Sequence, residues 1–381
     1  MSPTNYESVP SPSRKIEALA QPRDSQALAW ASQSSLAGAT KPCASRDSIA
    51  IYCRFSSKDD MAQMPTCDGR QTSTISTPGT SIQEQAFEAA SLHTVMTGSN
   101  ETIISANKSM FFLEMNPFAP VSVVLLHMLF SSHLEWKHIW PKLAEYHMLI
   151  PDLPCHSKSR NVCKKEEYSV GLCADLVAEM IREHAHDRRA HVVGVGTSGF
   201  IALDIVRRHP DVVTSGFISG AWPQKGMRLT VTNHPRLLYA GLWSILHSPG
   251  SLFFKMSGYS GEYHNDELLN AIKRNGSSRL AEAGCSYAKE WQEVQFAETG
   301  VADKRLCMIA GGKQDDPEGV RQAAKLLKSQ SSGGQGSTTC AYQVREAILA
   351  WNLQFPPLFA KAIQCWIEHL PMPDEFEDMP I

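Results

Sequence analysis

The strongest constraint on the fold is an alternation of strand patterns and helical patterns. The runs VSVVLLH at 121–127 and AHVVGV at 190–195 are almost uninterrupted apolar sequence, which is typical of strands covered on both faces. Strands joined by crossover helices form a parallel sheet, so we expect an α/β fold with a mostly parallel central sheet and helices on both faces. The other expected strands are 147–152, 212–219, 305–312 and AYQVREA (341–347), and the expected helices are 134–146, 169–185, 198–208, 317–328 and 356–370.

The alternation also predicts a domain organisation. Residues 94–221 and 301–372 carry it and form the expected core, whereas 222–300 contain apolar helical stretches without a clear strand and are interpreted as an inserted helical cap. Residues 1–85 are rich in Ser, Thr, Pro, Gln and Ala, which predicts a disordered tail. The rival interpretation, an organelle transit peptide, is disfavoured by Glu7, Glu17 and Asp24.

Composition excludes several classes of protein. The net charge of −3, without long runs of one sign, argues against nucleic acid as a partner. The ten cysteines form no CxxC pair and no cysteine–histidine cluster, so we expect reduced thiols, no metal and no cofactor. The longest apolar run, at 118–130, is too short to cross a bilayer, which predicts a soluble, cytoplasmic protein without membrane contact.

One turn carries the chemistry. The strand at 190–195 runs directly into Gly194-Val195-Gly196-Thr197-Ser198-Gly199, followed by a helical pattern. A sharp strand-to-helix turn of pattern Gly-x-Ser-x-Gly presents a nucleophilic serine above a sheet. Here the serine position is occupied by Gly196.

From about residue 100 to 372 the chain resembles the α/β-hydrolase family, especially fungal hydrolase-like proteins of polyketide and polyketide–peptide biosynthesis. Besides the turn, four segments carry the resemblance: 123–136, 149–160, 308–316 and 348–371. In the first, His127-Met128 stands at the family's His-Gly, and in the second Cys155 stands at a usual glycine. The third places Asp315 in the triad acid position, and the fourth has Leu349 where related sequences have histidine.

The resemblance implies that two of the three triad members are replaced. A Ser-His-Asp relay needs a nucleophilic oxygen and an imidazole that takes its proton. Gly196 and Leu349 supply neither, so ordinary ester hydrolysis is disfavoured.

Ser198 is the alternative nucleophile. Two residues further into a helix turn a side chain by roughly 200°, so Ser198 is expected to face the sheet. A register shifted by two would put Ser198 in the turn but would place Phe200 where a small residue is needed. Asp315 is open to two compatible interpretations, triad acid or helix cap ahead of Pro317.

The remaining candidates are residues that would touch a ligand. Backbone N–H groups of Thr197 and of the Met128-Leu129 loop would polarise a carbonyl, unless the bulk of Met128 closes that hole. His127 either contacts a ligand or, like His156, braces a loop. Trp351 and Asn352 are expected to face the cleft, and six apolar residues either line a cap cavity or form the cap's core: Leu237, Leu238, Leu242, Trp243, Phe253 and Phe254.

Three functions follow as hypotheses. The leading one is a non-hydrolytic condensation, cyclisation or auxiliary step on a small apolar metabolite, with the polyketide class implied by the resemblance. The second is a serine hydrolase or esterase with a rearranged site based on Ser198 and Asp315. The third is a catalytically silent binding or scaffold protein, for example a partner of a biosynthetic synthase.

Overall fold

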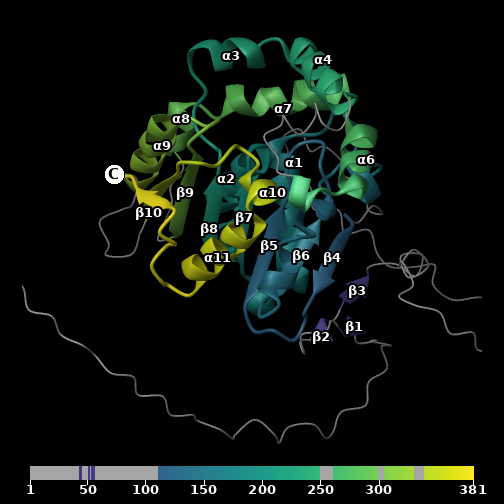
Figure 1. Cartoon of the computed structure of the whole chain (residues 1–381), viewed down its shortest axis with the longest axis vertical. Helices are drawn as coiled ribbons and strands as arrows, with labels where there is room; N and C mark the ends of the chain where they lie inside the picture. Colours follow the sequence, from purple (N-terminus) through teal and green to yellow (C-terminus); the bar gives the residue numbers. More distant parts are fainter. Residues whose placement is uncertain are drawn as a thin grey trace, which may run out of the picture. The chain divides into compact units, whose positions relative to one another are not determined.

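The computed structural model describes residues 110–248, 261–298, 304–329 and 339–381, with three short strands nearer the N-terminus. In this part of the chain one sheet has nine strands, in the order β11-β10-β9-β8-β7-β5-β6-β4-β3 (Figure 1). Adjacent strands from β10 to β6 pair in parallel, and β11, β4 and β3 add antiparallel strands at the two sides. The strands are β3 (Cys53–Phe55), β4 (Phe112–Met115), β5 (Ser122–Leu126), β6 (His147–Pro151), β7 (Ala190–Val195), β8 (Val213–Ser219), β9 (Arg305–Gly311), β10 (Thr339–Val344) and β11 (Phe376–Asp378).

The predicted α/β architecture is confirmed. Two apolar cores flank the sheet. One contains side chains from α1 (Val170–His184), α2 (Thr197–Arg208) and α9 (Pro317–Ser329), and the other contains side chains from α11 (Pro356–Ile367). Because β5 and β7 are buried along their whole length, their continuous apolar sequence is explained by packing on both faces.

Two local predictions differ from the structure. The single helix expected at 134–146 is instead a pair of 3-10 helices, η2 (His133–Trp136) and η3 (Trp140–Leu143). Pro141 lies at the start of η3, where its missing N–H costs nothing, whereas inside a continuous helix it would remove a hydrogen bond. Strand β11 lies beyond the expected end of the core at 372.

Part of the segment expected to be a disordered tail forms paired β-strands. Within 1–85 the structure describes β1 (Cys43–Ala44), which pairs with β2 (Ala50–Ile51), and β3, which pairs with β4. These strands were not predicted from the composition. The rest of the segment expected to be disordered lies outside the described residues.

The chain between β8 and β9 is helical where it is described, and α3, α4 and α7 lie together across one end of the sheet (Figure 1). Of the six apolar residues considered for a cap cavity, Leu242 packs against the core, but Leu237, Leu238 and Trp243 are exposed, and 251–260 lie outside the described residues. The helices of this insertion are α3 (Gly226–Thr232), α4 (Pro235–Leu246), η7 (Gly261–Tyr263), α6 (Asp266–Asn275), α7 (Ser278–Glu290) and α8 (Glu293–Glu298). The remaining short helices are η4 (Ser157–Ser159), η5 (His186–Arg188), η6 (Pro210–Val212) and α10 (Trp351–Gln354).

Candidate functional site

The turn between β7 and α2 has a glycine at its tip. Gly196 adopts φ 59° and ψ −121°, a conformation that residues with a β-carbon enter only at a cost. Its N–H donates to the Ser219 carbonyl oxygen at 2.8 Å, which ties the tip to the end of β8. A β-carbon added at Gly196 would lie 3.5 Å from Met128 Cγ and 3.9 Å from Leu349 Cδ1, which are ordinary contact distances. The turn therefore has room for a side chain that the sequence does not supply.

Three predicted positions converge at this tip. Met128 and Leu349 are the nearest side chains to the space beside Gly196, and we call these three residues the elbow cluster. Leu349 also abuts Gly220, and its N–H donates to Gln314 Oε1 at 3.1 Å. Both flanking side chains are partly exposed. The positions expected for the nucleophile (Gly196), the imidazole (Leu349) and the oxyanion loop (Met128) are thus adjacent, and the side chains there are apolar.

Ser198 lies beneath the turn. Its side chain is fully buried, and its hydroxyl oxygen accepts the Val195 N–H at 2.9 Å. The same oxygen lies 2.7 Å from the Leu126 carbonyl oxygen and 3.0 Å from that of Val195, so the hydroxyl proton is directed to the ends of β5 and β7. This placement corrects the rearranged-hydrolase alternative, because the hydroxyl serves buried backbone groups and does not face a substrate.

Two of the backbone donors suggested for a carbonyl oxygen, the N–H groups of Met128 and Leu129, are already engaged. The Leu129 N–H donates to Thr197 Oγ1 at 2.9 Å, and the Met128 N–H donates to Glu135 Oε2 at 3.0 Å. Helix α7 also packs closely on this loop, since a β-carbon at Gly284 would collide with Leu129. Of the two alternatives for the Met128-Leu129 loop, the structure therefore supports the closed one, although internal hydrogen bonds and not the bulk of Met128 occupy the donors.

Glu135 is a residue of the site that sequence reasoning missed. It is buried behind the loop in η2, and its Oε1 accepts from Asn352 Nδ2 at 2.7 Å. Burial raises the pKa of its carboxyl group to about 7, because removal from water disfavours the charged form. In the sequence it is one charged residue in a helical pattern, which is more often a solvated position, so no local signal marked it.

The raised pKa of Glu135 gives a testable pH dependence. Its ordinary value is 4.5, so between about 4.5 and about 7 the folded chain keeps a proton that the unfolded chain has lost. The carboxyl group therefore stabilises the fold least above pH 7, and the free energy of unfolding should fall by about 3 kcal/mol across this window. Glu135→Gln should abolish this fall, as measured by urea unfolding at several pH values. Identical pH profiles for both proteins would contradict the assignment.

The two candidate histidines hold loops in place by hydrogen bonds to backbone groups. His127 and His156 are fully buried, and their Nε2 atoms accept the N–H groups of Leu153 and Phe130, each at 2.9 Å. Their Nδ1 atoms donate to the carbonyl oxygens of Met128 and Pro154. Burial lowers the pKa values to about 4 and about 3, so both rings are neutral near pH 7. His127 thus joins two loops and does not face a ligand, which corrects its assignment to substrate binding.

Trp351 and Asn352 are also internal. Trp351 is fully buried, its indole N–H donates to Ser219 Oγ at 2.8 Å, and its ring lies 4.3 Å from that of Phe359. Asn352 is fully buried and contacts Glu135. The expectation that Trp351 lines a cleft is wrong, because the side chain turns into the core from the start of α10.

The two aspartates after β9 have separate contacts. Asp316 Oδ1 accepts the Gly319 N–H at 3.1 Å in the first turn of α9, which is a capping contact. Asp315 is buried, and its Oδ2 accepts the Gly311 N–H at 2.6 Å. The side chain of the preceding residue, Gln314, accepts the Leu349 N–H. The segment that carries Asp315 therefore contacts the backbone of Leu349, the residue at the expected histidine position.

Within the described segments, no group of three or more His, Cys, Asp or Glu side chains is arranged to hold a metal ion. No helix among the same residues combines the length and apolarity needed to span a bilayer.

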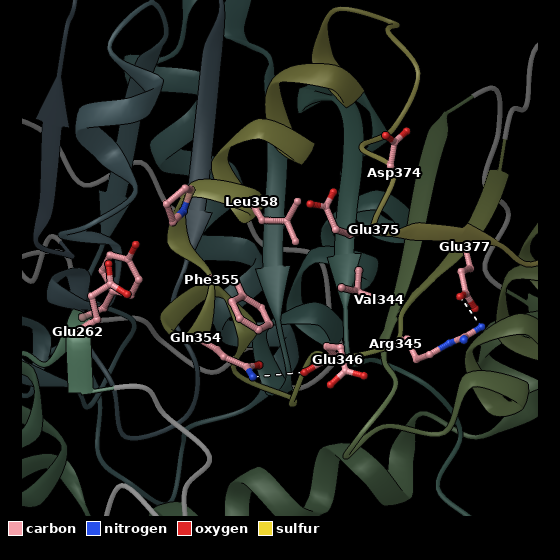
Figure 2. A pocket seen from close by; sticks show the side chains of 12 residues that line it. Glu262, Val344, Arg345, Glu346, Gln354, Phe355, Leu358, Asp374, Glu375 and Glu377 are labelled. Carbon is pink, nitrogen blue, oxygen red and sulfur yellow. Dashed lines mark hydrogen bonds and ion pairs between the residues drawn. The ribbon is translucent and has the colours of Figure 1, made fainter.

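A groove of about 570 Å³ is lined in part by Glu346 and Gln354, the two ends of the 346–354 loop (Figure 2). Gln354 links it to that loop, since its amide donates to the Glu346 carbonyl oxygen and accepts the Ile348 N–H. None of the predicted site residues lines it. Its lining residues are Glu262, Tyr263, Val344, Arg345, Glu346, Gln354, Phe355, Pro357, Leu358, Asp374, Glu375 and Glu377.

Known proteins support the fold. No protein-family model matches the chain. An AB hydrolase superfamily protein of Gibberella zeae is 25% identical over 274 residues, which cover 71% of this chain and 88% of that protein. The epoxide hydrolase CorEH, solved without ligand, superposes with a TM-score of 0.52 at 16% identity, over 69% of this chain and 96% of that one. A hydrolase from Pseudomonas aeruginosa PA01 gives 0.50 at 14% identity, over 70% and 99%.

Proposed function

We propose that this member of the α/β-hydrolase superfamily is a non-hydrolytic protein that binds a small, largely apolar metabolite beside the elbow cluster. There it would promote a condensation or cyclisation, or an auxiliary step, of a polyketide-type substrate. The substrate class comes from the resemblance to fungal polyketide-pathway proteins. The protein would contribute by holding reacting groups together and by excluding water.

One observation carries the proposal. The turn that presents a nucleophile in this fold is retained, yet the space at its tip is bordered by Met128 and Leu349. An apolar, partly exposed surface favours an apolar ligand, since binding removes its apolar area from water. Without a nucleophile or an imidazole at these positions, the same surface cannot form and cleave an acyl-enzyme.

A second candidate is a catalytically silent binding protein, such as a partner of a synthase. It is favoured by the hydrogen bond from the Leu129 N–H to Thr197 Oγ1, because this donor would have to be released before it could polarise a carbonyl. Both candidates share the ligand site and differ only in whether a product forms.

The test uses a defined probe, a linear β-ketoamide with a terminal aldehyde. Its intramolecular condensation forms a carbon–carbon bond and releases water. The probe is incubated with wild-type protein and with Leu349→Asp, which places a charge in the elbow cluster. Glu346→Gln, an exposed change on the groove side of the same loop, is the matched control. Binding is followed as a shift in Tm, and cyclised product by mass spectrometry.

We expect a Tm increase and faster cyclisation with wild type and Glu346→Gln, and neither with Leu349→Asp. A Tm increase without faster cyclisation would favour the silent binder and overturn the catalytic part of the proposal. Equal behaviour of wild type and Leu349→Asp would overturn the ligand site itself. Release of p-nitrophenol from p-nitrophenyl esters by wild type, lost in Ser198→Ala, would restore the hydrolase alternative.

A further inference from the structure

Two thiols lie in contact in the segment that follows β6, outside the elbow cluster. Cys155 Sγ is 3.2 Å from Cys163 Sγ, and it also contacts the Cys163 carbonyl oxygen at 3.3 Å. A disulfide bond is about 2.05 Å long, so joining these sulfurs requires them to approach by only about 1.2 Å. Both cysteines are free in this structure.

The backbone at Cys155 is a second, independent observation. Its φ of 66° lies in the left-handed region, which a glycine enters without strain and a cysteine does not. A glycine would adopt this conformation without strain. The chain instead keeps a cysteine there, and the side chain that causes the strain is the one in contact with Cys163.

The surroundings of the pair favour thiol exchange. Cys163 is partly exposed and is followed directly by Lys164 and Lys165. The hydrogen bond between the two thiols, helped by the charge of Lys165 and opposed by burial, holds the pKa of the Cys155 thiol below its ordinary value. The same hydrogen bond and burial raise the pKa of the Cys163 thiol. Cys155 is therefore the better nucleophile of the two, which suits the closing step, in which its sulfur attacks Cys163. The nearby Cys173 differs, because it is fully buried and burial raises the pKa of its thiol.

We propose that Cys155 and Cys163 are a reversible redox pair that closes to a disulfide by exchange with a low-molecular-weight disulfide such as oxidised glutathione. The more exposed Cys163 sulfur bonds to one glutathione sulfur, and the other glutathione leaves with the proton of Cys163. Cys155 sulfur then attacks Cys163 sulfur, and the second glutathione leaves with the proton of Cys155. Two protein thiols are oxidised to one disulfide, and one glutathione disulfide is reduced to two thiols.

The bridge would enclose a segment that braces the loop behind the elbow cluster. His156 in this segment accepts the Phe130 N–H, and the Ser157 N–H donates to Asn275 Oδ1 of α6 at 2.9 Å. Asn275 in turn donates to the carbonyl oxygens of Phe130 and Ser131. Closing the bridge restricts the segment and so stabilises these contacts. The inference does not depend on the proposed function.

The experiment equilibrates the full-length chain in buffers of increasing oxidised-to-reduced glutathione ratio, alkylates the remaining thiols after acid quenching, and maps tryptic peptides. Trypsin cleaves after Lys158 and Arg160, between the two cysteines, so a bridge joins two distinct peptides. Cys155→Ser and Cys163→Ser are the test variants, and Cys173→Ser is the matched control. Hydrogen exchange of the Phe130 amide is measured in the reduced and oxidised proteins.

We expect the joined peptides in wild type and Cys173→Ser, their reversal by reduced glutathione, and exchange at Phe130 that is several-fold slower after oxidation. Two results in wild type overturn the proposal: both cysteines remaining alkylated at every ratio, or glutathione remaining attached to Cys163 without closure. Because wild type decides the outcome, poor folding of either serine variant does not affect it.

Discussion

The triple variant Gly196→Ser, Leu349→His, Met128→Gly should hydrolyse p-nitrophenyl esters that the wild type leaves intact. A β-carbon at position 196 meets no clash, and the turn already has the conformation that presents a nucleophile. A histidine at 349 would border the same space, and removal of the Met128 side chain gives the substrate access. We expect at least a ~10³-fold increase in kcat/KM over wild type, since triad members act as a unit.

Two control variants make this expectation specific. Gly196→Ser alone should stay inactive because no imidazole takes its proton. Adding Asp315→Asn to the triple variant should return the rate to the wild-type level if Asp315 is the triad acid, because the group proposed to orient the imidazole is then lost. Serine at φ 59° is strained by about 1–3 kcal/mol, so folding is checked by circular dichroism. An inactive, folded triple variant would show that Leu349 does not occupy the imidazole position.

Trp351→Ala should be among the most destabilising single changes in the chain. The side chain is fully buried, and its ring lies 4.3 Å from Phe359 and 5.7 Å from Phe376. Truncation leaves a cavity at the junction of α10, α11 and β11 and removes the indole N–H that contacts Ser219. We expect a loss of about 3–5 kcal/mol in the free energy of unfolding, measured with urea.

The matched control is Trp243→Ala, which removes a half-exposed tryptophan of α4. This change should cost no more than about 0.5 kcal/mol, as is usual for the surface. Trp351→Phe should fall between the two, because it keeps most of the apolar volume and loses the hydrogen bond. A stable Trp351→Ala protein with impaired probe binding would contradict the internal placement and return this side chain to the ligand site.

Much of the fold was predictable because its strands are doubly covered and therefore almost purely apolar. The run at 190–195 and the strand β7 coincide, and the glycine at the tip follows directly from the spacing. Strand β11 carries no such signal, because it has only three residues at a sheet edge and only the first of them, Phe376, is buried. The two 3-10 helices η2 and η3 are predicted as one α-helix, because short 3-10 helices and an α-helix place apolar residues at similar spacing in the sequence.

The site was predictable in position but less so in contacts. The spacing of the motifs correctly anticipated that the side chain of Ser198 turns toward the strands. It did not anticipate Glu135, because burial of a carboxyl group depends on a partner, Asn352, that lies 217 residues away. The prediction that Trp351 faces a cleft is wrong for a related reason. The direction of this side chain, at the start of a short helix, is set by packing against residues of distant strands, Ser219 of β8 and Phe376 of β11.

The most direct test of the central claim is intact-mass measurement of wild-type protein after treatment with a fluorophosphonate probe, which bonds to activated serine oxygens. The absence of a nucleophile at Gly196 and the burial of Ser198 predict no adduct on wild type and a single adduct on the triple variant, mapped to position 196. An adduct on wild-type protein that maps to Ser198 and disappears in Ser198→Ala would contradict the account.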